Sequence, residues 1–258
     1  MRNLNFNSDN MLFRCSSLHK LIGTPKNIDE DLLTQEVISA KNTPASKRNQ
    51  SQKDIIKKAL DNSLSATAKT LVKEMVREKV HNAPYKFNGS KETEKGHLVE
   101  ESAIRFLMQN EFITAEKNTK RFSNEWISGE PDVISNHVVY DTKCPWSYWS
   151  MPYFKDDIES KSVDAGYDIQ QIGYIWLLNE NGYEIKEAQL KYILMPTPDQ
   201  LLNKKYDDFS AHIDFVNDLP AKDRIKTYKI QYDQSIVDLI KIKITSARKY
   251  AKELLEQL

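Results

Sequence analysis

The sequence has few cysteines and no long apolar run, and both absences exclude classes of protein. Its 258 residues include two cysteines, Cys15 and Cys144, whereas an iron-sulfur cluster takes four thiolates. We therefore expect two reduced thiols. No apolar stretch approaches the roughly 18 residues that a membrane span needs, and the opening MRNLNFNSDN lacks the apolar core of a secretory signal. We expect a cytoplasmic protein that makes no membrane contact.

The chain also lacks a net charge, since 37 Lys and Arg balance 37 Asp and Glu. A neutral total argues against a protein that coats nucleic acid by bulk charge. Residues 1–95 hold 17 basic against 11 acidic side chains, and residues 96–258 hold 20 against 26. A basic N-terminal third is compatible with a local grip on a phosphate backbone, but ordinary variation in charge explains it equally well.

Length and composition predict one α/β domain. The chain is 40% hydrophobic and 29% charged, which are ordinary globular values, and it is too short for two comfortable domains. Within this domain we expect a helical part over about 1–92, a catalytic core over about 93–196, and a C-terminal strand and helix over about 197–258.

The most informative stretch is GEPDVISNHVVYDTKCPW, residues 129–146. Strand-forming residues flank a short polar turn, which predicts a β-hairpin. If Asn136 and His137 are the two central turn residues, Asp132 lies directly opposite Asp141, about 5 Å away at Cβ. Lys143 follows two residues after Asp141, so strand alternation returns it to the same face.

Two carboxylates held this close repel each other unless a cation lies between them. Their hard oxygen atoms favour Mg²⁺, with Mn²⁺ as a substitute. An ammonium at Lys143 can orient an attacking water or offset charge that builds on a phosphate. The alternative is a surface hairpin with solvated Asp and Lys side chains, but the facing positions of Asp132 and Asp141 favour a metal site.

The pair Pro131-Asp132 followed by Asp141-Thr142-Lys143 resembles the signature of PD-(D/E)XK nucleases. The continuation through Cys144, Pro145 and Trp146 is similar to the lambda-exonuclease and YqaJ-type viral recombinase family. The resemblance implies a restriction-endonuclease-like core, which is an α/β fold with a mixed β-sheet flanked by α-helices. It implies metal-dependent hydrolysis of DNA, with the Thr142 carbonyl as a further metal ligand beside the two aspartates.

A helix predicted over residues 92–110 carries a second match. Val99, Ala103, Phe106 and Leu107 form its apolar stripe, and Glu100 lies at the edge of this stripe, one turn after Gly96. The spacing resembles the Gly-x-x-x-Glu helix of the same family, which implies that Glu100 helps to hold a second ion. Without the resemblance, Glu100 would be a surface residue. Gly96 leaves room for a close approach by a backbone or a DNA strand.

A buried helix predicted over residues 167–177 carries the third match, because Tyr167, Gln170 and Tyr174 share one of its faces. The Gln-x-x-x-Tyr spacing resembles that of related nucleases, which implies that Gln170 steadies the substrate and Tyr174 contacts DNA. The alternative is a pair of core polar residues that have found partners.

Near the N-terminus, Ser16 or Ser17 is expected to cap a short helix that ends at Gly23. Such a cluster can hold a phosphate at a helix N-terminus. The family resemblance places 5′-phosphate binding nearby, with Arg14, Ser16 and Ser17 as candidates.

Elsewhere the pattern predicts a loop over 41–53, a helix from Ser63 or Ser65 to about Val80, and a connecting strand within 111–128. It also predicts strands over 190–195 and 226–231 and a helix over 235–258, whose apolar stripe packs on the domain or on another subunit. The aromatic loop 145–154 either stacks on bases or packs over the sheet edge.

Together these motifs predict a Mg²⁺-dependent exonuclease that acts on the ends of double-stranded DNA. The resemblance further implies 5′ to 3′ polarity, a single-strand annealing protein as partner in phage-type recombination in the cytoplasm of a bacterial host, and a trimeric homo-oligomer. Two alternatives are an endonuclease with the same core and a non-catalytic module that binds DNA ends.

Overall fold

The computed structural model of the chain describes residues 6–83 and 89–258, which fall into two compact units. The first unit comprises Met1–Lys86, Glu125–Ile127 and Asp233–Leu258, and the second comprises Phe87–Asn124 and Ser128–Tyr232. Two such units can fold as one domain, so the expectation of a single domain stays a prediction.

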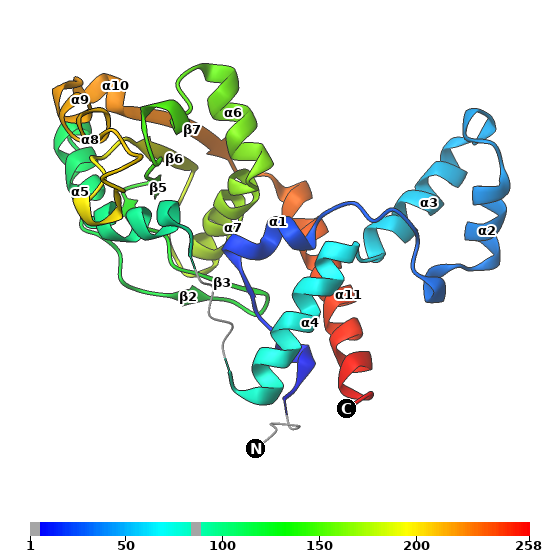
Figure 1. The fold of residues 1–258 in the computed structure, drawn as a ribbon. Coiled ribbons are helices and arrows are strands. Elements are labelled where there is room, and N and C mark those ends of the chain that lie inside the picture. Colours follow the sequence, from blue (N-terminus) through cyan, green and yellow to red (C-terminus); the bar gives the residue numbers. More distant parts are fainter. Residues whose placement is uncertain (1–5, 84–88) are drawn as a thin grey trace. The chain divides into compact units, whose positions relative to one another are not determined.

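The second unit is built on a four-stranded mixed sheet in the order β4-β5-β6-β7 (Figure 1). The strands β5 and β6 run parallel, while β4 and β7 pair antiparallel at the two edges. A separate short antiparallel pair joins β2 to the end of β3. The strand bounds are β2 Phe122–Ser123, β3 Ile127–Gly129, β4 Val133–Ser135, β5 Val138–Lys143, β6 Glu187–Ile193 and β7 Ile225–Gln231. This arrangement confirms the predicted α/β fold with a mixed sheet.

Helices cover both faces of this sheet, and the strand alternation decides which side chains meet which helix. Helix α5 packs on one face, where its Ile104 joins Val133 and Tyr140 in a buried cluster. Helix α7 packs on the other face, where Gln170 meets Asp141. The helices of this unit are α5 Lys91–Glu111, α6 Lys155–Asp164, α7 Tyr167–Glu180, α8 Phe209–His212, α9 Asp214–Asp218 and α10 Ala221–Arg224.

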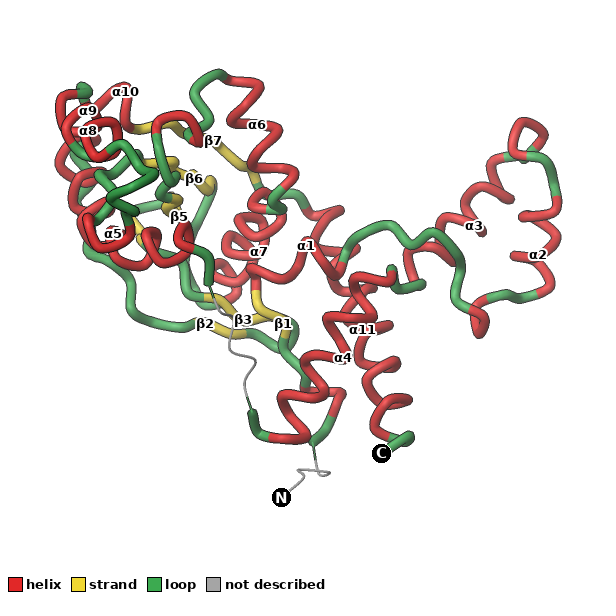
Figure 2. The backbone as a smooth tube through the Cα atoms, viewed as in Figure 1, coloured by secondary structure: helices red, strands yellow, loops and turns green. Residues whose placement is uncertain are grey.

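The first unit is mainly helical (Figure 2). Helix α11 packs against α4, α3 and α1 through the buried side chains of Ile240, Ile244 and Ala247. The predicted stripe of this helix ends early, because Leu258 is 58% exposed. The elements of this unit are β1 Phe13–Arg14, α1 Leu18–Leu21, α2 Gln35–Asn42, α3 Gln50–Asn62, α4 Ala66–His81 and α11 Gln234–Leu255.

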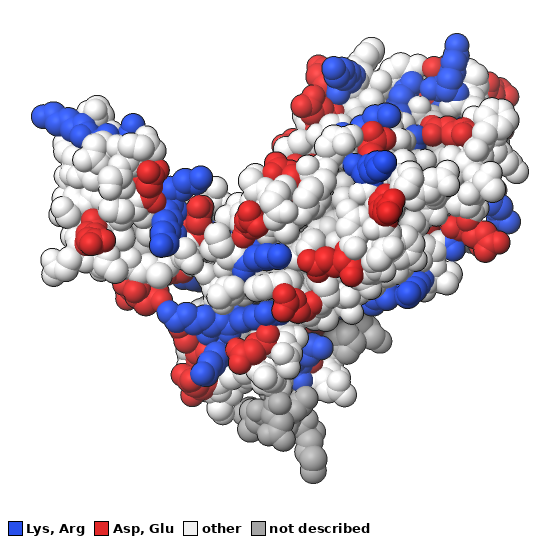
Figure 3. All heavy atoms as spheres, turned by 180° about the vertical axis from the view of Figure 1, so that it is seen from behind, with Lys and Arg blue, Asp and Glu red and all other residues white. Residues whose placement is uncertain are grey.

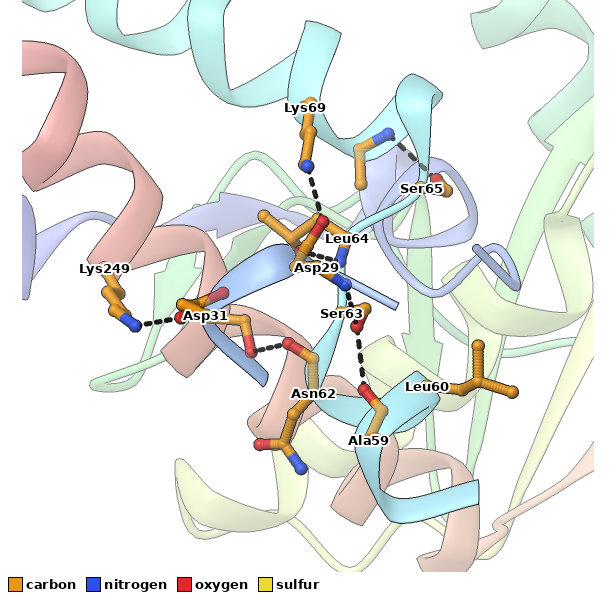
Figure 4. Close-up of polar contacts among 12 residues, drawn as sticks. Asp29, Asp31, Ala59, Leu60, Asn62, Ser63, Leu64, Ser65, Lys69 and Lys249 are labelled. Carbon is orange, nitrogen blue, oxygen red and sulfur yellow. Dashed lines mark hydrogen bonds and ion pairs between the residues drawn. The ribbon is translucent and has the colours of Figure 1, made fainter. Parts of the chain in front are cut away.

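A polar network ties the segment before α2 to the junction of α3 and α4 (Figure 4). The Asp29 carboxylate accepts hydrogen bonds from the backbone N–H of Leu64 at 2.9 Å and from Lys69 Nζ at 2.6 Å. The Asp29 N–H donates to Ser63 Oγ, which donates to the Ala59 carbonyl. The carboxylate therefore satisfies a backbone donor in the turn between the two helices, where an unpaired N–H would be costly.

The expected loop over 41–53 is wrong at both ends. Helix α2 extends to Asn42 and helix α3 begins at Gln50. Asn49 and Gln52 form a reciprocal capping box that starts α3 inside the polar stretch, and Arg48 donates to three carbonyls at the end of α2. Local hydrogen bonds therefore determine where α2 ends and α3 begins, and hydrophobic periodicity does not reveal such bonds.

Two other local expectations also need correction. A short helix does carry Leu18 and Leu21 inward, but neither serine caps it through its side chain, since Ser17 Oγ donates to the Arg14 carbonyl at 2.8 Å. The stretch 111–128 does not form one connecting strand, because its pairing is interrupted: Lys117 makes an isolated bridge to Val133, and two short strands follow at Phe122–Ser123 and Ile127–Gly129.

The helix predicted to begin at Ser63 or Ser65 is confirmed as α4, with Ser65 as its N-cap. Both cysteines are free, as expected. No helix within the described ranges combines the length and the apolar character that a membrane crossing requires. On the face drawn in Figure 3, Lys and Arg are interspersed with Asp and Glu.

Candidate active site

The hairpin has the predicted register. Val133 pairs with Tyr140 and Ser135 with Val138, which leaves Asn136 and His137 as the central turn residues. Asn136 adopts a positive φ of 51°, a conformation that asparagine tolerates better than most residues. Extending the ladder by one position brings Asp132 opposite Asp141.

Asp132 directs its carboxylate along the hairpin toward the backbone of the facing strand. Its Oδ2 accepts from the Thr142 N–H and from Thr142 Oγ1, each at 2.6 Å. The Thr142 carbonyl, expected to be a metal ligand, lies 3.4 Å from Lys143 Nζ. The two strands of the hairpin are therefore linked by side-chain bonds at the point where the acidic pair sits.

Asp141 is the centre of a buried polar cluster on the α7 face of the sheet. The residue is 3% exposed, and its carboxylate accepts from Lys143 Nζ and, at 3.3 Å, from Gln170 Nε2. Gln170 Nε2 also lies 3.0 Å from the Tyr174 hydroxyl, which reaches the Glu130 carbonyl at 3.4 Å. The predicted return of Lys143 to the face of Asp141 is confirmed, and the predicted shared face of Gln170 and Tyr174 is confirmed by their direct contact.

The pKa values of Asp132 and Lys143 are both raised, by different balances of burial and of the charge on neighbouring carboxylates. Burial, followed by the charge of Asp141, raises the pKa of Asp132 to about 7. Burial alone would lower the pKa of Lys143, but Asp141 and Asp132 outweigh it and raise this pKa above its ordinary value. The ammonium therefore stays charged at neutral pH and acts as a fixed cation, with its nitrogen 4.9 Å from the centre of the Tyr167 ring.

A pocket of about 560 Å³ opens beside Lys143 and Thr142. Its other walls come from the first turns of α5 and from the loop after β5. A methyl group built on Gly96, which lines this pocket, would meet no atom within 4 Å, so the space beside this glycine is open. The remaining lining residues are Glu92, Thr93, His97, Glu100, Cys144, Pro145, Trp146, Ser150, Lys161, Tyr167 and Tyr192.

Glu100 lies in this pocket but is paired elsewhere. Its Oε1 contacts Lys117 Nζ at 2.5 Å, and no three His, Cys, Asp or Glu side chains within residues 6–83 and 89–258 are grouped closely enough to hold a metal ion. Glu100 thus does not join Asp132 and Asp141 in a three-ligand group. The prediction that it holds a second ion stays a prediction.

The acidic pair has the donor chemistry of a magnesium site. Mg²⁺ in proteins is usually bound through one or two carboxylates, with water and substrate phosphate completing its shell, and Asp132 and Asp141 supply two. The raised pKa of Asp132 reflects a buried anion that lacks sufficient positive charge, a deficit that a divalent cation between the carboxylates would relieve.

The four predicted DNA-binding residues belong to different units of the chain. Arg14 and Ser16 are exposed and Ser17 is half-buried, and all three belong to the first unit. Tyr174 is 5% exposed, and its hydroxyl contacts Gln170 Nε2 and the Glu130 carbonyl. A contact of any of these four residues with DNA stays a prediction.

Sequence reasoning missed a buried lysine that shapes this site. Lys95 is fully buried, and its ammonium donates to the carbonyls of Pro145 and Trp146 at 2.7 and 2.9 Å. It thereby fixes the backbone that follows Lys143. Its position directly before Gly96, in the helix predicted over residues 92–110, could have indicated that Lys95 lies near the site. Sequence reasoning did not consider it because lysine is among the residues least often buried.

Comparisons with known proteins agree with this fold. The sequence matches no family model and no curated protein. Among solved structures, it is similar to an alkaline exonuclease from Laribacter hongkongensis, with 8% identity over 98% of this chain and 93% of the other and a TM-score of 0.53, a likeness that concerns the fold alone.

A nearer similarity is to a phage-related exonuclease from Haemophilus somnus 129PT. The two sequences are 34% identical, the match covers 96% of each chain, and the TM-score is 0.76. Identity at this level over nearly the whole length indicates common descent as well as a shared fold. The chain therefore belongs to the phage-related exonuclease family.

Proposed function

We propose that this protein is a Mg²⁺-dependent exonuclease that hydrolyses phosphodiester bonds at the ends of double-stranded DNA. The observation that carries the proposal is the cluster of Asp132, Asp141 and Lys143 on one hairpin, with Gln170 hydrogen-bonded to Asp141. The similarity to a phage-related exonuclease supports the same reaction class.

Each group in the cluster has a distinct chemical role. The metal would supply Lewis-acid stabilisation of charge on the scissile phosphate, and Asp132 and Asp141 would hold it. Lys143 remains protonated because its carboxylate neighbours raise its pKa. As a cation, it would orient the attacking water and offset charge on the phosphate.

Gln170 fixes the geometry of this cluster from the helix side. Its amide nitrogen donates to Asp141 Oδ1, and its position is held by the Tyr174 hydroxyl. The Asp141 carboxylate is thus restrained by Gln170 from α7 and by Lys143 from β5. Such restraint lowers the reorganisation needed when a substrate binds.

The finer proposals follow the family resemblance. We propose 5′ to 3′ degradation, a 5′-phosphate contact through Arg14, Ser16 and Ser17, and a role in phage-type recombination in the cytoplasm of a bacterial host. We further propose that the product strand passes to a single-strand annealing protein and that the enzyme works as a trimer.

The test is a time course on linear duplex DNA that carries a label at one end, with Mg²⁺ and with a chelator. The wild-type protein should release labelled mononucleotides from the 5′ end only with the metal. Asp132→Ala and Asp141→Asn should abolish this release, whereas Asp156→Asn, an exposed aspartate on α6, should degrade DNA at the wild-type rate.

Three outcomes would contradict parts of the proposal. Full activity of Asp141→Asn would refute the site. Equal cleavage of closed circular DNA would assign the protein as an endonuclease. Binding of duplex ends with no product at any metal concentration would indicate a non-catalytic end-binding module.

A further inference from the structure

Large aromatic side chains gather on the surface next to the pocket that holds Lys143. Trp149 is 88% exposed, Phe154 is 66% exposed and Phe215 is 44% exposed. Tyr148 joins the group, because its ring contacts Trp149 at 5.5 Å and Phe215 at 5.3 Å between centroids, both in edge-on geometry. We call Tyr148, Trp149, Tyr153, Phe154 and Phe215 the aromatic cluster.

Trp149 is held in place by the cluster but is not covered by it. It lies in the short 3-10 helix Tyr148–Ser150, which Ser147 and Ser150 stabilise with a reciprocal pair of hydrogen bonds. Its contact with Tyr148 is edge-on, at an interplanar angle of 79°, which leaves most of the indole in solvent. A rigid and uncovered tryptophan is typical of a binding surface.

This surface is continuous with the candidate active site. A second hollow, of about 610 Å³, is lined by Trp149, Met151 and Pro152, and it shares two lining residues, Ser150 and Lys161, with the pocket at Lys143. The hollows therefore adjoin at Lys161. The backbone linking them is the loop that directly follows β5 and that Lys95 holds through two carbonyls.

The chemistry of this second hollow suits a nucleobase and not the DNA backbone. Asp157 and Asp164 line this hollow, and their carboxylates repel phosphate but can accept from the N–H groups of bases. Lys161 Nζ uses one donor on the Ser150 carbonyl at 2.5 Å. An ammonium has three donors, so Lys161 keeps two for a phosphate at the boundary between the hollows.

We propose that Trp149 stacks on an unpaired base of the DNA strand whose phosphate lies in the pocket beside Lys143, with Lys161 contacting the phosphate between them. This inference rests on the proposed nuclease function and adds the binding position of the neighbouring nucleotide. The occupant is a base of single-stranded DNA, since a base within a duplex is already stacked on both of its faces.

The test measures binding of a fluorescein-labelled twelve-residue oligothymidine in the presence of a chelator, so that the result does not depend on cleavage. Trp149→Ala should weaken binding about 5- to 150-fold, the range for losing one stacked base. Trp149→Phe should restore most of the affinity. Tyr206→Ala removes a matched aromatic, 75% exposed and outside the cluster, and should bind like the wild type.

A second readout uses the fluorescence of the protein itself. The sequence has four tryptophans, and the other three are buried or half-buried. Oligothymidine should therefore quench wild-type fluorescence strongly and quench Trp149→Phe weakly. The same measurement without DNA, at rising protein concentration, reports whether a second copy of the chain covers Trp149.

Unchanged affinity of Trp149→Ala, or equal weakening in Trp149→Phe and Trp149→Ala, would overturn the inference. A shift of Trp149 fluorescence with protein concentration alone would overturn it in favour of a subunit contact. Loss of binding in Trp149→Ala together with an inactive wild type would support the stacking site and refute the nuclease assignment, so the two failures are distinguishable.

Discussion

Substituting Gly96 with alanine should stabilise the protein and impair its activity. Gly96 lies within α5, Lys91–Glu111, where alanine is favoured over glycine by about 1 kcal/mol. A methyl group there meets no atom within 4 Å, so no clash offsets this gain. For a chain of this size, 1 kcal/mol corresponds to a rise in Tm of about 2–4 °C.

The loss of activity follows from the position of the same methyl group. Gly96 lines the pocket that holds Lys143 and Thr142. If a DNA strand passes over Gly96 to reach Lys143, the added methyl group overfills the contact, which typically costs about 1–3 kcal/mol. This corresponds to a decrease in kcat/KM of about 5- to 150-fold.

The assay combines thermal unfolding with initial rates on end-labelled duplex DNA. Ser102→Ala is the matched control, because Ser102 is an exposed residue of the same helix outside the pocket and its substitution raises helix propensity alone. A Gly96→Ala variant with a higher Tm and wild-type kcat/KM would refute the close-approach argument. A lower Tm would refute the inference that the space is open.

Other substitutions separate catalysis, charge burial and folding. Lys143→Met should lower kcat about 100- to 1000-fold and leave duplex binding under chelation detectable in a gel-shift assay; an unchanged rate would exclude the proposed cation. Burial lowers the pKa of Lys95 to about 8 from 10.5, so the unfolded chain binds more protons between these pH values and wild-type unfolding free energy rises with pH there. Lys95→Met should remove about 3 kcal/mol of this rise, and parallel pH curves from urea unfolding would contradict the argument. Asp29→Ala should lower the unfolding free energy by about 2 kcal/mol, because the Leu64 N–H and Lys69 lose their acceptor. The control Asp31→Ala breaks only an exposed ion pair and should lower the unfolding free energy by less than about 1 kcal/mol. Equal losses of unfolding free energy in the two variants, measured by urea unfolding, would show that the Asp29 network does not stabilise the fold.

The hairpin was predictable because two local rules determine it. Side chains alternate along a strand, and a two-residue turn fixes which residues face each other. These rules placed Asp132 opposite Asp141 and Lys143 on the face of Asp141, as the register has them. The helix that carries Gln170 was equally predictable, because its apolar residues recur at helical spacing.

The direction of individual carboxylates was not predictable in the same way. Asp132 lies opposite Asp141 in register, yet its Oδ2 bonds to Thr142, since a side chain at a strand end can rotate toward any nearby donor. Glu100 pairs with Lys117, which lies in a segment without hydrophobic periodicity. Contacts of this kind depend on tertiary structure, and residue spacing alone does not reveal them.

The buried side chain of Lys95 explains why the loop after β5 is fixed although its sequence resembles an irregular linker. The Lys95 ammonium donates hydrogen bonds to the Pro145 and Trp146 carbonyls. If Lys95 loses its proton, the neutral amine still has two N–H donors for these two carbonyls. The loop then leads to Trp149, whose neighbours hold its ring edge-on. Because this restrained loop joins the candidate metal site to the exposed indole, the distance between the two is fixed. Successive nucleotides of one bound strand would require such a fixed distance.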